Sequence, residues 1–100
     1  MYLALIADVI DSKMVQERFN LQKQLEKTLR KMNELFGDYL ASCFTLTLGD
    51  EFQALLKVDA PVFQIIDTLR SKLSPTQLRF GIGLGEIATA IDPLQSIGAD

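Results

Sequence analysis

Two pairs of acidic residues have the clearest potential for chemistry in this sequence. Asp8 and Asp11 follow an apolar run at the N-terminus, and Asp50 and Glu51 follow the alternating segment 45–48. An acidic pair in a turn is usually a solvated part of that turn. Two such pairs brought together would instead favour a hard divalent cation, because Mg²⁺ binds one or two carboxylates together with substrate phosphates. Mg²⁺ or Mn²⁺ is therefore the expected cofactor.

The second acidic pair lies at the tip of a predicted β-hairpin. Alternating threonine and leucine at 45–48 is typical of a strand with one buried face. Gly49 followed by Asp50 fits a two-residue turn of type II′, in which the glycine takes a positive φ. Residues 51–56 form the return strand.

The elements that must position these carboxylates are four strands and two helices. Strands are predicted at 2–10, 40–48, 51–56 and 78–84, and a long helix at 13–36. Gly37 is placed to cap the end of that helix. A second helix starts at 59–61, where Asp59 can cap it, and ends at Ser74-Pro75. The helix at 13–36 has a stripe of large apolar residues at spacings of three and four, and its lysines and arginine lie on a solvated surface.

This order of elements predicts an α+β fold with a ferredoxin-like βαββαβ sheet, a palm-like arrangement with both helices on one face of an antiparallel sheet. In the usual spatial order, 4-1-3-2, the first strand lies beside the third, so both acidic pairs meet at one edge. The start of the first helix would offer N–H groups to a phosphate there. Gly81, Gly83 and Gly85 share one side of the last strand, which is either a helix-packing groove or part of a ligand site. Arg79 is interpreted as a surface strand residue rather than a phosphate clamp.

Composition limits the remaining classes of function. The chain has 100 residues, enough for a single domain over 1–100, and its net charge of −3 argues against binding of duplex nucleic acid by this domain. It has one cysteine and no histidine, which excludes an internal disulfide and His-based zinc or triad chemistry. The sequence contains no signal peptide or membrane span, so a cytoplasmic location is expected.

Three segments resemble nucleotide-handling families. Residues 7–12 (ADVIDS) are similar to the first metal-binding segment of class III nucleotidyl cyclases, and residues 48–52 (LGDEF) match four letters of the GGDEF signature of diguanylate cyclases. Residues 78–87 are similar to a third cyclase segment. More narrowly, DVIDS, TLGDEFQ and the final SIGAD resemble the SatD family of bacterial proteins. The chain is thus identified as an N-terminal SatD-like domain, and a truncated fragment of a longer protein is expected.

The resemblance implies that Asp8 and Asp50 are metal-binding aspartates and that Glu51 corresponds to the GGDEF glutamate. Asp11 stands where cyclases have glycine, so it either blocks phosphate or adds a ligand. With Val9, Ser12, Lys13 and Gly49 as nucleotide-binding residues, the expected ligand is a nucleoside triphosphate. Cyclase activity is not implied.

The alternative is a degenerate, non-catalytic cyclase-like module that regulates or forms a homodimer. A region beyond residue 100 could bind DNA or a partner.

Overall fold

The computed structural model describes residues 1–10 and 18–85 of the chain. The elements follow in the predicted order: β1 (Tyr2–Val9), α1 (Arg18–Phe36), a 3-10 turn η2 (Gly37–Tyr39), β2 (Leu40–Leu48), β3 (Glu51–Lys57), α2 (Val62–Leu73) and β4 (Leu78–Gly85). The predicted bounds of β2 are identical to these, and those of β1, β3 and β4 differ by one residue each. The predicted first turns of α1, at 13–17, lie outside the described residues.

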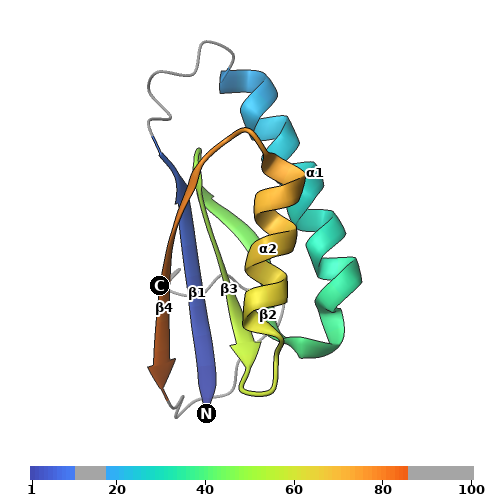
Figure 1. Cartoon of the computed structure of the whole chain (residues 1–100), viewed down its shortest axis with the longest axis vertical. Coiled ribbons are helices and arrows are strands. Elements are labelled where there is room, and N and C mark those ends of the chain that lie inside the picture. Colours follow the sequence, from blue (N-terminus) through green and yellow to red (C-terminus); the bar gives the residue numbers. More distant parts are fainter. Residues whose placement is uncertain (11–17, 86–100) are drawn as a thin grey trace.

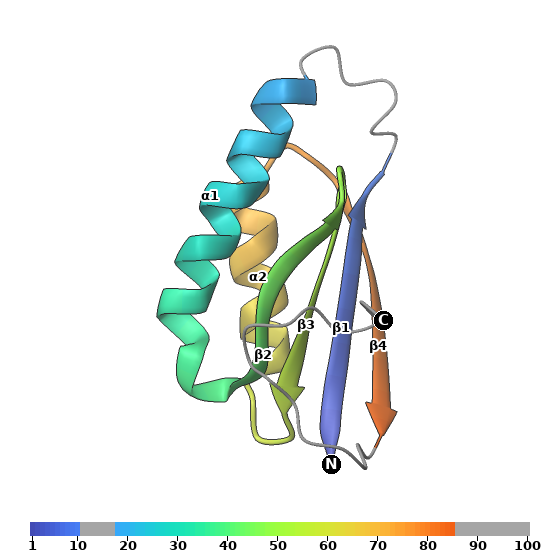
Figure 2. The same ribbon diagram turned by 180° about the vertical axis from the view of Figure 1, so that it is seen from behind.

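The four strands form one antiparallel sheet in the order β2-β3-β1-β4. Both helices cover the same face of the sheet, as the two opposite views show (Figures 1 and 2). The predicted α+β, ferredoxin-like fold is confirmed, including the strand order and the side taken by the helices. The C-terminal end of β1 and the start of β4 are therefore direct neighbours, although they lie far apart in the sequence.

The core lies between the sheet and the helices. On β1, Leu5, Ala7 and Val9 are buried and alternate with less buried residues, the pattern of a strand with one face on a core. The predicted stripe of α1 is buried as well: Leu21, Leu25, Leu29, Met32 and Phe36. These residues meet the helix-facing side of β3, where Phe52, Ala54 and Leu56 are fully buried. Burial of this apolar surface is the main force that holds α1 on the sheet.

The side chain of Asn33 ties α1 to β2. Its Oδ1 accepts a hydrogen bond from the backbone N–H of Phe44 at 2.7 Å, and its Nδ2 donates to the Phe44 carbonyl at 3.2 Å. Phe44 lies where the pairing of β2 with β3 shifts register, between Ser42 and Thr45. A bulge leaves backbone groups outside the ladder, and the amide of Asn33 satisfies both groups of Phe44.

Three predicted turn and cap assignments are wrong. Gly37 does not take the left-handed φ of a C-cap, because α1 passes directly into η2, where the N–H of Leu40 donates to the Gly37 carbonyl. The N-cap of α2 is Pro61 rather than Asp59, and no side chain caps that helix. Gly49 also lacks the positive φ of a type II′ turn. At Gly37 a backbone hydrogen bond of η2 takes the place of the predicted cap.

The helices cover only the first half of β4. Leu78 is buried and Phe80 is half-buried under the guanidinium of Arg70, but Ile82 and Leu84 are 50% and 62% exposed. The glycines of β4 lie on the other face, since Gly81 pairs with Ile6 rather than with a core residue. The interpretation of these glycines as a helix-packing groove is therefore wrong for both α1 and α2.

Candidate functional site at the sheet end

Three charged residues form a row across the end of the sheet. Asp8, near the C-terminal end of β1, lies opposite Glu51 of β3 on one side and opposite Arg79 of β4 on the other. Because paired residues of antiparallel strands share a face, all three belong to the face away from the helices. The row brings together residues from three separate segments of the chain.

Arg79 forms a bidentate ion pair with Asp8. The Nε of Arg79 donates to Oδ1 at 3.1 Å, and its Nη2 donates to Oδ2 at 3.3 Å. The Arg79 side chain is 70% exposed and that of Asp8 is 36% exposed. Two parallel bonds orient the carboxylate, but solvent screens an exposed pair, so its contribution to stability is small. Arg79 thus orients both oxygens of Asp8. A ligand that competes for Asp8 could displace Arg79 at a small cost in free energy.

The hairpin tip joins the same end of the sheet. The backbone N–H of Val9 donates to the carbonyl of Asp50 at 3.0 Å. Gly49 lies against α1, where an added Cβ would be 2.6 Å from the Nε2 of Gln22. A side chain at position 49 would thus displace the flexible end of Gln22, and Gly49 has no positive φ.

The carboxylate of Glu51 has a neighbour in the same hairpin. The hydroxyl of Thr47 lies 3.2 Å from the Glu51 carbonyl and 3.4 Å from its Oε2, and can donate to either. Glu51 and Asp50 are both half-buried. The Thr47 hydroxyl of β2 thus lies beside the Glu51 carboxylate.

The structure brings together all five predicted site residues that it describes. Asp8, Asp50, Glu51, Val9 and Gly49 all lie at this end of the sheet. The side chain of Val9 is buried in the core, and its N–H is engaged by Asp50. The other predicted site residues, Asp11, Ser12 and Lys13, lie outside the described residues. Within residues 1–10 and 18–85, no three carboxylate or thiol groups cluster closely enough to hold a metal ion unaided.

Arg79 is the site residue that the sequence analysis missed. The interpretation of Arg79 as a surface strand residue agrees with its exposure, but it does not include the ion pair with Asp8. The signal was present in the predicted strand order, since antiparallel pairing of the first and last strands brings a position near residue 79 beside Asp8. Choosing Arg79 needed the register, and the alternation of β4 alone does not specify it.

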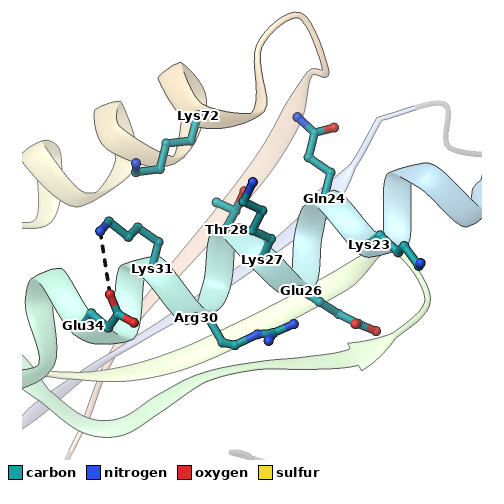
Figure 3. Close-up of a pocket in the computed structure, with 9 residues that line it drawn as sticks. All are labelled: Lys23, Gln24, Glu26, Lys27, Thr28, Arg30, Lys31, Glu34 and Lys72. Carbon is teal, nitrogen blue, oxygen red and sulfur yellow. Dashed lines mark ion pairs between the residues drawn. The ribbon is translucent and has the colours of Figure 1, made fainter.

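Two hollows on the described surface are lined by residues other than the sheet-end carboxylates. A hollow of about 360 Å³ lies nearby, between Ile10 and the segment 74–78 that leads into β4. A larger one, of about 980 Å³, lies between α1 and α2 and is lined by charged residues (Figure 3). Neither hollow is lined by Asp8, Asp50 or Glu51.

The fold and the charged row define a small α+β domain with an acidic sheet end. Comparison with known families places it more closely: the chain belongs to the SatD family, whose family model matches residues 2–100. Neither the curated proteins nor the solved structures contain a match to the chain. Among the described residues, no helix is long and apolar enough to cross a membrane.

Proposed function

We propose that this SatD-family domain binds the phosphates of a nucleotide through a divalent cation at the sheet end. Asp8, Asp50 and Glu51 are the proposed oxygen ligands and Mg²⁺ or Mn²⁺ the proposed cation. The observation that carries the proposal is the register of β1, which sets Asp8 between Glu51 and Arg79. The proposal concerns binding and contains no catalytic step.

The charges of the site support a divalent cation. Three carboxylates and one guanidinium leave two net negative charges at the end of the sheet. All potential protein ligands are oxygens, the donors that Mg²⁺ prefers, and Mg²⁺ commonly keeps waters and takes only one or two carboxylates. The residues present therefore fit such an ion without a preformed cage. Bound there, the cation would neutralise phosphate charge.

Arg79 is the proposed phosphate contact. Its guanidinium now holds both oxygens of Asp8, in a planar fork that suits a carboxylate and a phosphate equally well. When the cation takes Asp8, Arg79 would exchange the carboxylate for a phosphate oxygen. The exchange costs little because the ion pair is exposed.

The first experiment is thermal unfolding of the chain with Mg²⁺ or Mn²⁺ and each of ATP, GTP and GDP. A ligand that binds only the folded state stabilises it by about 2.7 kcal/mol at about a hundred times its dissociation constant. We expect a shift that requires both metal and nucleotide and that Asp50→Asn abolishes. Glu51→Gln serves the same purpose if Asp50→Asn does not fold.

The matched control is Asp38→Asn, which makes the same chemical change in η2, away from the sheet-end row. Asp38→Asn should keep the full ligand shift. A well-folded chain that shows no metal-dependent shift with any of the three nucleotides would refute the proposal. An equal loss of the shift in Asp38→Asn and Asp50→Asn would refute the assignment of the site.

A second candidate function is self-association through β4. In the described sheet β4 is an edge strand, and two large apolar side chains on it, Ile82 and Leu84, are half or more exposed. Exposed edges with apolar side chains favour pairing with another strand. Phe63, at the start of α2, is 81% exposed as well.

Sedimentation analysis over a range of concentrations tests this second function. A dimer that forms with rising concentration and is lost in Leu84→Lys would support it, with the equally exposed Val58→Lys as the control. A monomer at all concentrations would refute self-association through β4.

A further inference from the structure

A large hollow lies on the helical layer, away from the sheet end, along α1 and beside Lys72 of α2. Its volume is about 980 Å³. We call it the helix groove; its lining is Lys23, Gln24, Glu26, Lys27, Thr28, Arg30, Lys31, Glu34 and Lys72 (Figure 3). All nine lining residues are polar or charged.

The helix groove concentrates positive charge in an acidic chain. Its lining holds five of the ten lysines and arginines and two of the thirteen carboxylates, a net charge of +3. Since the whole chain carries −3, the remaining residues carry −6. The groove is therefore a local basic patch on a chain whose remaining residues have a net negative charge.

Three lysines are directed into the space between the two helices. Figure 3 shows Lys27 and Lys31 extending from α1 toward α2 and Lys72 extending from α2 toward α1, whereas Arg30 extends along the other side of α1. Lys31 also lies 3.7 Å from Glu34, an ion pair with both side chains more than half exposed. An exposed pair of this kind contributes little and yields readily to another anion.

The lining also limits what can bind. Without apolar side chains it offers no anchor to the hydrophobic face of a helix. Lysine ammonium groups are point charges on flexible stems, so they do not select the planar geometry that an arginine fork selects. The buried Thr28, 6% exposed, supplies a polar floor. The ligand is thus anionic, with several charges and no apolar core.

We infer that the helix groove is a docking site for a short acidic segment of a partner protein. Lys27 and Lys31 are one helical turn apart, a rise of about 6 Å. Carboxylates at alternate positions of an extended segment are spaced by about 7 Å, which matches that distance. A long nucleic acid would continue past the groove onto surfaces that carry −6, beyond the roughly 8 Å over which the local charge acts in physiological salt.

The test is fluorescence anisotropy with the full chain and a labelled peptide of alternating glutamate and serine, at about 0.05 M salt. We expect saturable binding that weakens about tenfold in Lys27→Glu/Lys31→Glu and about threefold in Lys72→Glu. The matched control is Lys57→Glu, the same change of charge at an exposed lysine outside the groove lining. It should change the affinity less than twofold, or about 0.4 kcal/mol.

Several outcomes would overturn the inference. One is no binding of the peptide at about 0.05 M salt by a chain whose unfolding is normal. Another is an equal loss in Lys57→Glu and in the groove variants, which would indicate attraction by charge in general. Tighter binding of a single-stranded oligonucleotide of similar length, or of inorganic pyrophosphate, would assign the groove to a different ligand. Circular dichroism and thermal unfolding of each variant distinguish lost binding from lost folding.

Discussion

The sheet end and the helix groove carry opposite charges, and they are built in different ways. At the sheet end, Asp8, Glu51 and Arg79 come from three strands and are aligned by backbone ladders. In the helix groove, Lys27 and Lys31 are neighbours on one helix, and only Lys72 comes from elsewhere. The first site depends on tertiary register, and the second depends mainly on helical periodicity.

This difference teaches what each region can recognise. A bidentate pair such as Arg79 with Asp8 fixes the orientation of a carboxylate and so favours a ligand of defined geometry. Flexible, exposed lysines add charge without fixing its direction, and they suit a ligand with repeated charges. The two proposals follow this contrast: a metal-bound nucleotide phosphate for the sheet end and an acidic segment for the groove.

The largest expected effect tests whether the sheet end depends on the core beneath it. Phe52 follows Glu51, is fully buried and packs its ring against that of Phe44 at 6.4 Å between centroids. Phe52→Ala should lower the free energy of unfolding by about 3–5 kcal/mol, measured by urea denaturation. Phe63→Ala, at an 81% exposed position, should change it by less than about 0.5 kcal/mol. Similar losses of unfolding free energy in both variants would contradict a stabilising role for the core beneath the sheet end.

The next effect concerns the anchor between the helical layer and the sheet. Asn33→Ala leaves the N–H and carbonyl of Phe44 without their partner, so we expect a loss of about 2 kcal/mol in the free energy of unfolding. Asn33→Asp keeps an acceptor for the N–H and should lose less. Equal stability of wild type and Asn33→Ala in urea denaturation would show that water replaces the amide.

A smaller effect separates the two roles proposed for Arg79. Arg79→Gln should cost about 0.2–1 kcal/mol of stability, because the pair with Asp8 is exposed. It should strengthen binding of Mg²⁺ alone, since Asp8 is released, and weaken binding of the metal–nucleotide complex, since a phosphate contact is removed. Isothermal titration of both ligands measures this, with Arg30→Gln as the control. Parallel changes for the two ligands would rule out the exchange of partners by Arg79.

The smallest effect is expected in the helix groove. Lys31→Glu should change the thermal unfolding free energy by less than about 0.5 kcal/mol, because both partners of the Lys31–Glu34 pair are largely exposed. A loss above about 1 kcal/mol would mean that Lys31 supports the packing of α1 on α2. In that case its effect on peptide binding could not be assigned to charge.

Most of the fold was predictable from hydrophobic periodicity. The alternation in β2 matches the two-residue period of a strand, and the stripe of α1 matches the helical period of about 3.6 residues. Burial of apolar surface then favours a single arrangement of the layers. The meeting of Asp8 with Glu51 followed from the strand order, because the end of β1 and the start of β3 must be adjacent once those strands pair. That part of the site is a consequence of pattern and topology.

Turns, caps and partners were less predictable, because they depend on contacts that no local pattern contains. Gly49 suggested a positive φ from its dipeptide, but it has none, and its neighbour in the fold is the amide of Gln22 on α1. Asn33 stood in a helical pattern as one polar residue among many, and only the register shift of β2 made it an anchor. Local sequence cannot reveal which remote group will come within hydrogen-bonding distance.

The sequence alone therefore determined the elements, their order in the sheet and the end at which the carboxylates gather, because periodicity and pairing rules act over short segments. The tertiary structure decided that Arg79 holds Asp8 and that Lys72 faces the lysines of α1. Both pairings depend on register and helix packing to within one residue. A shift of one residue in β4 would turn Arg79 to the opposite face of the sheet.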